Sequence, residues 1–228
     1  MPKFLPRTDI VIQINLTTWK IRFFWKIGFL AGQLITEKRF TEKKMQKFVI
    51  LDRDGVINYD SDKYIKSPDE WEPIPGSLEA IVRLNQAGFR VVVITNQSGI
   101  ARGLFTLDDL NQIHNKMHKL LSEIGGTIEA IFFCPHGKKE NCKCRKPCPG
   151  LFHDFADRLG IRLADVPAVG DSLRDLQAAA VSGAQQILVL TGKGRHALDG
   201  DMEGLDGVQV YDDLATFVDC FLKKVNSI

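Results

Sequence analysis

Two aspartates, Asp52 and Asp54, follow the apolar run at 48–51 and precede Gly55. A short run rich in β-branched residues is typical of a strand buried on both faces, as in a parallel sheet. Because side chains alternate along a strand, we expect both carboxylates to point one way and Arg53 the other. Like charges this close together raise the pKa of one carboxyl group or recruit a cation. The alternative is a simple turn, because Asp-Gly favours turns.

Other apolar runs of the chain also end in polar residues. The run at 89–94 ends at Thr95, and the run at 166–170 ends at Asp171, with Asp175 one helical turn later. Ligands of open α/β sheets bind outside the carboxyl ends of the strands, so these side chains should meet there. For Thr95 the alternative is the N-cap of a helix.

The side chains predicted for this edge form a set with a defined chemistry: Asp52, Asp54, Thr95, Lys146, Asp171 and Asp175. Carboxylate oxygens suit Mg²⁺, which usually also holds a substrate phosphate. One carboxylate can attack phosphorus as a nucleophile. A lysine and a hydroxyl can hold the phosphoryl oxygens while charge develops. The pattern therefore predicts Mg²⁺-dependent phosphoryl transfer.

Four further residues have the spacing of a zinc site: Cys134, His136, Cys142 and Cys144. These four ligands fill a tetrahedron and leave no open position, so the Zn²⁺ would be structural. The alternatives are reduced cysteines without a metal, or a disulfide among them. Cys148 lies outside this pattern and is expected to be a free thiol, whereas Cys220 is expected to have a structural role on an apolar face.

A pair of histidines, His114 and His118, has the i, i+4 spacing of helical metal ligands. No third ligand lies nearby in the sequence. We therefore expect both to be surface residues of the helix predicted over 106–123.

Strands and helices alternate along the chain. The strands predicted by short apolar runs cover 48–51, 89–94, 128–133, 166–170, 186–190 and 208–211. The predicted helices cover 78–87, 106–123, 151–159 and 214–225, and one more ends at Ala180. This alternation predicts an α/β, Rossmann-like fold whose mostly parallel sheet has helices on both faces. Residues 195–207 are rich in Gly and Asp and are expected to form a loop.

Residues 1–44 differ from the rest, since they hold nine Lys or Arg against three acidic residues. The apolar stretch at 21–30 is too short and too charged to span a membrane, and no cleavage site suggests a signal peptide. We expect translation to start at Met45, which leaves a domain at 45–228. The alternative is a basic surface helix that touches a membrane. A net charge of +2 gives no basic surface for nucleic acid.

The order of these motifs resembles the haloacid dehalogenase-like phosphatases. Asp-x-Asp-Gly, Thr-Asn, a lysine and Gly-Asp-x-x-x-Asp follow one another at predicted strand ends. Three stretches, at 52–55, 95–103 and 134–147, more closely resemble the D-glycero-D-manno-heptose 1,7-bisphosphate 7-phosphatases. The histidinol-phosphate phosphatases are related and share the zinc loop.

The resemblance implies roles for individual residues. Asp52 would be the nucleophile, and Asp54 would act as general acid and then as general base. Mg²⁺ would be bound by the Asp52 and Asp171 carboxylates and by the Asp54 carbonyl. Thr95 and Lys146 would hold the phosphoryl group. The substrate contacts would come from Arg53, Asp60, Lys63, Asn96, Gln97, Ser98 and Arg145.

The expected function is therefore removal of the C7 phosphate from a heptose bisphosphate, in the cytoplasm, by a monomer that supplies lipopolysaccharide synthesis. The alternatives are histidinol phosphate as the substrate, or a zinc-loop interaction module without activity. Residues 55–94 and 96–145 are filled by predicted core elements and the zinc loop. We therefore expect an enzyme without a cap domain, with the zinc loop as one wall of its site.

Overall fold

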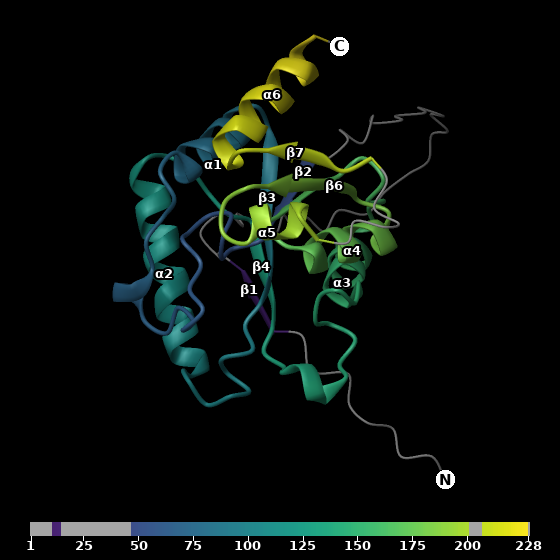
Figure 1. Cartoon of the computed structure of the whole chain (residues 1–228). Coiled ribbons are helices and arrows are strands. Elements are labelled where there is room, and N and C mark those ends of the chain that lie inside the picture. Colours follow the sequence, from purple (N-terminus) through teal and green to yellow (C-terminus); the bar gives the residue numbers. More distant parts are fainter. Residues whose placement is uncertain (1–10, 15–46, 201–206, 228) are drawn as a thin grey trace, which may run out of the picture.

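The apolar runs of the sequence form one seven-stranded sheet in the computed structural model, which describes residues 11–14, 47–200 and 207–227 (Figure 1). The strands are β1 (Val11–Ile14), β2 (Lys47–Leu51), β3 (Phe89–Asn96), β4 (Ala130–Cys134), β5 (Pro167–Gly170), β6 (Gln185–Val189) and β7 (Gln209–Tyr211). Their order across the sheet is β1-β4-β3-β2-β5-β6-β7. All neighbours pair in parallel except β1 and β4, which are antiparallel.

Helices connect the strands and cover both faces of the sheet (Figure 1). They are α1 (Ser77–Gln86), α2 (Leu107–Glu123), α3 (Gly150–Leu159), α4 (Leu173–Ser182), α5 (Gly194–Leu198) and α6 (Leu214–Asn226), with short 3₁₀ helices η2 (Pro68–Glu70) and η3 (Lys138–Glu140). Such coverage is what a parallel sheet requires, because both of its faces are apolar.

Alternating side chains of β2 divide the core in two. Val49 and Leu51 face the cluster that includes α1, α2 and α6, whereas Phe48 and Ile50 face the cluster that includes α3 and α4. All four side chains are buried. The predicted α/β fold with helices on both faces is thus confirmed, and β2 at its centre is held rigidly on both sides.

The connection from β2 to β3 leaves no room for a cap domain. Between residues 52 and 88 it contains only η2, α1 and the loops that join them. The connection from β3 to β4 contains α2, and residues 135–149 contain η3 and the cysteine-rich loop. The predicted capless organisation is therefore observed in the described chain.

Besides the short 3₁₀ helices η2 and η3, one strand and one α-helix were not predicted. Strand β1 comes from the basic N-terminal stretch and pairs with β4 with Val11 opposite Phe133, and α5 forms within the expected loop. Met45 and the stretch at 21–30, on which the start-site and membrane-helix hypotheses depend, lie outside the described residues. Within the described residues, no helix combines the length and apolarity needed to cross a bilayer.

Candidate active site

The centre of the sheet brings the predicted catalytic residues together. Asp52 directly follows β2, Thr95 lies at the end of β3, and Asp171 directly follows β5. Because β3 and β5 are the two neighbours of β2, these carboxyl ends meet at one edge. The chain order also reverses direction beside β2, which is where open α/β sheets bind their ligands.

A cavity of about 270 Å³ opens at this edge. Most of the predicted site residues line it: Asp52, Asp54, Asp60, Thr95, Asn96, Gln97, Ser98, Arg145 and Asp171. Three predicted residues do not line it, namely Arg53, Lys63 and Lys146. Lys63 is exposed to solvent, whereas Arg53 and Lys146 are buried behind the cavity wall.

Lys146 lies buried beneath the floor of the site. Its Nζ lies 3.1 Å from Asp52 Oδ2 and 2.6 Å from Asp175 Oδ1, and it donates a hydrogen bond to the Ile94 carbonyl. Burial lowers the pKa of Lys146, but the two carboxylates outweigh burial and raise the pKa above its usual value. The lysine is therefore a fixed ammonium group beneath Asp52.

Asp52, Asp171 and Asp175 form a group that we call the carboxylate cluster, with one oxygen of each within 4.8 Å of the others. Burial raises the pKa of Asp52 to about 6 even though Lys146 opposes it. Burial, with the charges of Asp175 and Asp52, raises the pKa of Asp171 to about 8. Crowded hard oxygen donors of this kind fit a divalent cation such as Mg²⁺.

The backbone at Gly55 keeps space beside this cluster. Gly55 has a φ of +81°, and a Cβ atom there would lie 2.0 Å from Asp171 Oδ2. The Asp171 carboxylate is fixed in turn by a hydrogen bond from the Lys193 backbone N–H. A larger residue at position 55 would thus displace the Asp171 carboxylate.

Asp175 has a structural task that sequence reasoning did not assign. One of its oxygens pairs with Lys146, and the other accepts hydrogen bonds from the backbone N–H and the hydroxyl of Ser172. The second set of bonds forms the capping box of α4. Burial raises the pKa of Asp175, but the Lys146 ammonium outweighs it and lowers the pKa overall.

Arg53 does not point away from Asp54, as strand alternation had predicted. Its Nε and Nη2 donate hydrogen bonds to the Asp54 carboxylate at 2.9–3.0 Å. Strand β2 ends at Leu51, so the alternation does not extend to residue 53. Arg53 is fully buried and does not line the cavity, which argues against the predicted contact with substrate.

His114 was expected at the surface and is instead fully buried. Its Nε2 lies 3.2 Å from Arg53 Nη1. Burial, followed by the Arg53 charge, lowers the pKa of His114 well below its usual value, so the ring is neutral. The apolar side of α2 was visible in the sequence, but the arginine that the histidine contacts was not.

Three of the remaining residues predicted to contact the substrate already bind other residues of the site. The Asn96 side chain donates a hydrogen bond to the Lys146 carbonyl and accepts one from the Lys146 backbone N–H, so it holds the backbone of the lysine. Gln97 donates hydrogen bonds to Asp54 Oδ2 and Thr95 Oγ1. Asp60 pairs with Lys193 at 2.6 Å.

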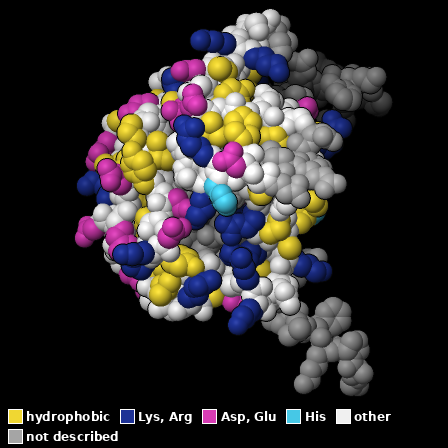
Figure 2. All heavy atoms as spheres, in the orientation of Figure 1, with side chains coloured by type: hydrophobic (Ala, Val, Ile, Leu, Met, Phe, Trp, Pro, Cys, Tyr) yellow, Lys and Arg dark blue, Asp and Glu magenta, His cyan; other side chains and the backbone are white. Residues whose placement is uncertain are grey.

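Cations missed by sequence reasoning also line the cavity: Arg102, Lys138, Arg174 and Lys193. Among the described residues, no carboxylate lies within ion-pair distance of Arg102, Lys138, Arg145 or Arg174. Figure 2 shows a concentration of Lys and Arg side chains in the lower central part of one face. The position of Arg174 between Asp171 and Asp175 was the available signal in the sequence.

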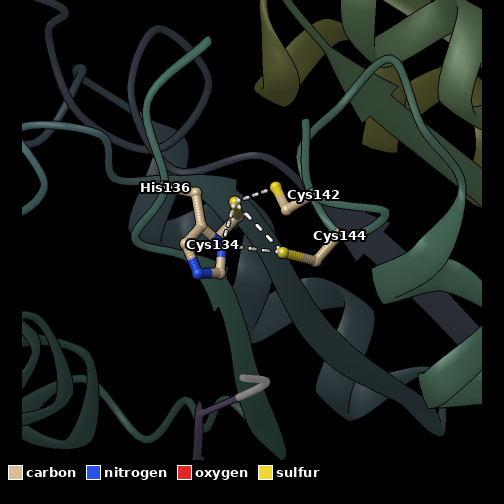
Figure 3. A group of neighbouring side chains, drawn as sticks. All are labelled: Cys134, His136, Cys142 and Cys144. Carbon is tan, nitrogen blue, oxygen red and sulfur yellow. Dashed lines mark hydrogen bonds between the residues drawn. The ribbon is translucent and has the colours of Figure 1, made fainter. Parts of the chain in front are cut away.

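The cysteine cluster, formed by Cys134, His136, Cys142 and Cys144, converges on one point (Figure 3). The Cys134 sulfur lies 3.6 Å from His136 Nδ1, 3.6 Å from the Cys142 sulfur and 3.3 Å from the Cys144 sulfur. These separations are close to the edges of roughly 3.5–3.8 Å in a tetrahedron with Zn–S and Zn–N bond lengths.

The cysteines of this cluster form no disulfide, and all five cysteines of the chain are free thiols. Burial raises the pKa of Cys142, and the hydrogen bond with Cys134 raises that of Cys144. Crowded sulfurs of this kind fit a cation that would stabilise the thiolates. Cys148 is a free thiol, as expected, whereas Cys220 is exposed to solvent, which does not fit the structural role expected for it.

Comparisons with known proteins agree with this geometry. Residues 13–183 match the family model of the haloacid dehalogenase-like hydrolases. The D-glycero-beta-D-manno-heptose-1,7-bisphosphate 7-phosphatase of Bordetella bronchiseptica is 55% identical over 179 residues, which cover 78% of this chain and 99% of that protein. The protein of the same name from Neisseria meningitidis serogroup A is 49% identical, over 75% of this chain and 92% of that protein.

Solved structures give the same result. The D,D-heptose 1,7-bisphosphate phosphatase of B. bronchiseptica, complexed with magnesium and phosphate, has a TM-score of 0.76 and 56% identity. That match covers 78% of this chain and 99% of the other. This chain therefore belongs to the haloacid dehalogenase-like hydrolases and, within them, to the family of the heptose-1,7-bisphosphate 7-phosphatases.

Proposed function

We propose that this protein is a Mg²⁺-dependent phosphatase that removes the C7 phosphate of D-glycero-β-D-manno-heptose 1,7-bisphosphate. The observation that carries the proposal is the 55% identity to a phosphatase of that name, over 99% of that protein and 78% of this chain. The β anomer follows the names of the relatives. The lysine beneath Asp52 and the cations across the cavity support the same reaction.

Asp52 is the proposed nucleophile, because its carboxylate faces the cavity and is fixed by Lys146. An Asp52 oxygen forms a bond to phosphorus while the bond from phosphorus to the sugar oxygen breaks. Asp54 gives its proton to that sugar oxygen, and an aspartyl phosphate remains on Asp52. Asp54 then takes a proton from the water that attacks phosphorus, which releases phosphate and restores Asp52.

The carboxylates of Asp52 and Asp171 and the backbone carbonyl of Asp54 are the proposed ligands of the Mg²⁺ ion. When bound, Mg²⁺ would neutralise charge on the phosphoryl oxygens and hold the phosphoryl group in line with Asp52. Thr95 lines the cavity and is proposed to hold a phosphoryl oxygen. Lys146 lies behind the cavity wall, but its Nζ is 3.1 Å from Asp52 Oδ2, so its charge is proposed to stabilise the phosphoryl group from beneath Asp52.

The second phosphate of the substrate matches the cavity's unpaired cations. Arg145 and Arg174 repel each other enough to contribute to a lowered pKa of Arg145, after the larger effect of burial. No carboxylate of the described chain lies within ion-pair distance of either guanidinium group. A phosphate between two guanidinium groups would relieve the repulsion and accept paired hydrogen bonds. Histidinol phosphate has one phosphate and is less suited to this wall.

The sugar is proposed to contact polar side chains that line the same cavity: Asp60, Asn96, Gln97 and Ser98. Arg53 and Lys63 lie outside the cavity and are left out of the proposed sugar contacts.

The cysteine cluster is proposed to hold a structural Zn²⁺. It fixes the loop between β4 and α3, from which Lys138 and Arg145 reach the cavity, and Arg145 donates a hydrogen bond to the His136 carbonyl. The metal would thus shape one wall of the site without joining the chemistry.

We also propose a cellular role from this chemistry. The product, heptose 1-phosphate, is suited to an enzyme that activates the sugar with a nucleotide for lipopolysaccharide core synthesis. The enzyme is proposed to act in the cytoplasm as a monomer, with residues 45–228 as the catalytic domain.

The test is kcat/KM with Mg²⁺ for both anomers of heptose 1,7-bisphosphate and for histidinol phosphate. We expect the β anomer to be preferred over histidinol phosphate by at least about 100-fold, which is about 2.7 kcal/mol. A preference for histidinol phosphate would move the enzyme to another pathway and refute the bisphosphate assignment.

A further inference from the structure

The general acid proposed for this reaction is held by a buried network that reaches away from the cavity. Asp54 Oδ1 accepts hydrogen bonds from Arg53 Nε at 3.0 Å and from Asn58 Nδ2 at 2.9 Å. Asp54 Oδ2 accepts from Arg53 Nη2 at 3.0 Å and from Gln97 Nε2 at 2.9 Å. Donors on both oxygens fix the rotation of this carboxyl group.

Arg53 is the largest part of this network. Its side chain is 0% exposed, although a buried guanidinium group is costly unless each of its donors is matched. Nε and Nη2 face Asp54, and Nη2 also donates to Gln97 Oε1 at 3.2 Å. Nη1 points the other way, to His114 Nε2 at 3.2 Å.

His114 comes from α2, which belongs to the connection between β3 and β4, so it joins the network from outside the strand-end motifs. Its ring is 0% exposed and lies edge-on to Phe133, with ring centroids 6.3 Å apart. An arginine has only donors, so the neutral ring must accept at Nε2 and carry its proton on Nδ1. The imidazole is thus fixed in position and in tautomer.

We propose that His114 and Arg53 are positioning residues for Asp54: the buried imidazole fixes the guanidinium, which fixes the orientation of the carboxyl group. This inference rests on the proposed function, because it assumes that Asp54 protonates the leaving oxygen. A general acid misplaced by about 1 Å costs on the order of 100-fold in rate. His114 does not line the cavity and is proposed to act on Asp54 through Arg53.

The consequence is a dependence on the leaving group. A sugar alkoxide is a poor leaving group and must be protonated as it departs, whereas nitrophenolate leaves without a proton. A misplaced Asp54 therefore slows phosphoryl transfer from a sugar phosphate but has little effect on transfer from p-nitrophenyl phosphate. For both substrates kcat/KM reports only the steps up to formation of the aspartyl phosphate, so the later hydrolysis does not affect the comparison.

The experiment measures kcat/KM of the full chain with Mg²⁺ for heptose 1,7-bisphosphate and for p-nitrophenyl phosphate. His114→Leu removes the acceptor while nearly keeping the volume, and we expect a 10- to 100-fold loss on the sugar ester. The loss on the nitrophenyl ester should stay below about threefold. His114→Gln offers an oxygen acceptor to Arg53 and should restore most of the lost rate.

His118→Leu is the matched control, since His118 lies one turn along the same helix and is only partly buried. It should leave both rates unchanged. Arg53→Lys keeps the positive charge but loses the paired guanidinium donors that face Asp54, so it should show the same selective loss. This variant serves as the test if His114→Leu does not fold.

Equal losses on both substrates for His114→Leu or Arg53→Lys would overturn the proposal and leave a purely structural role. If the wild-type enzyme does not hydrolyse heptose 1,7-bisphosphate, the proposed function fails. The same ratio is then measured with glycerol 3-phosphate, which has an equally poor leaving group, so the two failures are distinguishable.

Discussion

The carboxylate cluster and the cysteine cluster are both suited to a divalent metal, but they differ in access. Asp52, Asp171 and Asp175 all line the cavity, whereas none of the four residues of the cysteine cluster does. The first offers hard oxygens from two strand ends and from α4. The second offers four softer ligands, one at the end of β4 and three in the loop that follows. A metal that takes part in a reaction needs an open position, while a structural metal does not.

The largest expected effect is a loss of rate without a loss of fold, on substitution of Asp52 in the carboxylate cluster. Asp52→Asn should lower kcat/KM by about 10⁴-fold or more, because it removes the proposed nucleophile. The variant should fold, because it removes a charge that is costly to bury. Steady-state kinetics with thermal melts measure both, and Asp165→Asn, at an exposed position, is the control. Wild-type turnover in Asp52→Asn would refute the assignment.

Lys146 is expected to matter for both folding and chemistry. Lys146→Met leaves Asp52 and Asp175 without their counter-charge and should cost about 3–5 kcal/mol of unfolding free energy. The rate should fall as well, since the phosphoryl oxygens lose a cation. Lys193→Met removes an ion pair with a partly exposed lysine and should cost less than about 1 kcal/mol. Denaturant unfolding compares the two, and equal costs would contradict the buried role.

A substitution in the cysteine cluster should lower stability more than it lowers the catalytic rate. Cys144→Ser should release zinc and lower the melting temperature, because a structural metal site contributes directly to folding. Below the melting transition, kcat should change much less than in Asp52→Asn. Metal analysis and thermal melts test this, with Cys148→Ser as the control outside the cluster. A cysteine variant that melts normally but is inactive would contradict a structural zinc.

The two clusters should also differ in how pH affects the metal. In metal-free protein the pKa of Asp171 is raised from 3.8 to about 8, so the folded state holds this proton more tightly than the unfolded chain. Stability without Mg²⁺ should therefore fall as pH rises from 4 towards 8, by up to about 1.4 kcal/mol per pH unit. Mg²⁺ needs the ionised carboxylates, so its stabilising effect should grow over the same range.

Thermal melts with and without Mg²⁺ at pH 6 and pH 8 measure this dependence. Asp171→Asn should abolish most of it. A Mg²⁺ effect on the melting temperature that does not change with pH would show that Asp171 is not a ligand.

The smallest effect concerns the cationic wall of the cavity. Arg174→Ala should raise KM for the bisphosphate about tenfold, or about 1.4 kcal/mol, with little change in kcat, because Arg174 is proposed to contact only the remote phosphate. Lys138→Ala, at an exposed lysine of the same cavity, should change KM less. The same loss of affinity for heptose 7-phosphate would argue against a contact with the second phosphate.

Much of this arrangement could be predicted because it depends on local patterns. Asp52, Thr95 and Asp171 each follow a buried apolar run, and parallel strands bring such ends together. The cysteine cluster falls within eleven residues, so its spacing alone defined it. Metal ligands that are close in sequence, or that lie at the ends of strands, need no knowledge of long-range packing.

The rest depends on contacts that no local pattern contains. Arg53 turns back onto Asp54 because β2 ends two residues earlier. His114 is buried because α2 packs over that arginine. Strand β1 pairs with β4 across more than a hundred residues. In each case the partner, rather than the residue itself, determines the position.

The most direct test of the account is to trap the covalent intermediate. The enzyme is mixed with heptose 1,7-bisphosphate and Mg²⁺, quenched during turnover and treated with borohydride, which reduces an aspartyl phosphate to homoserine. Peptide mass spectrometry should find homoserine at position 52 and nowhere else. Homoserine at Asp54 or Asp171, or phosphate release with no reduced aspartate, would contradict the assignment of Asp52 as the nucleophile.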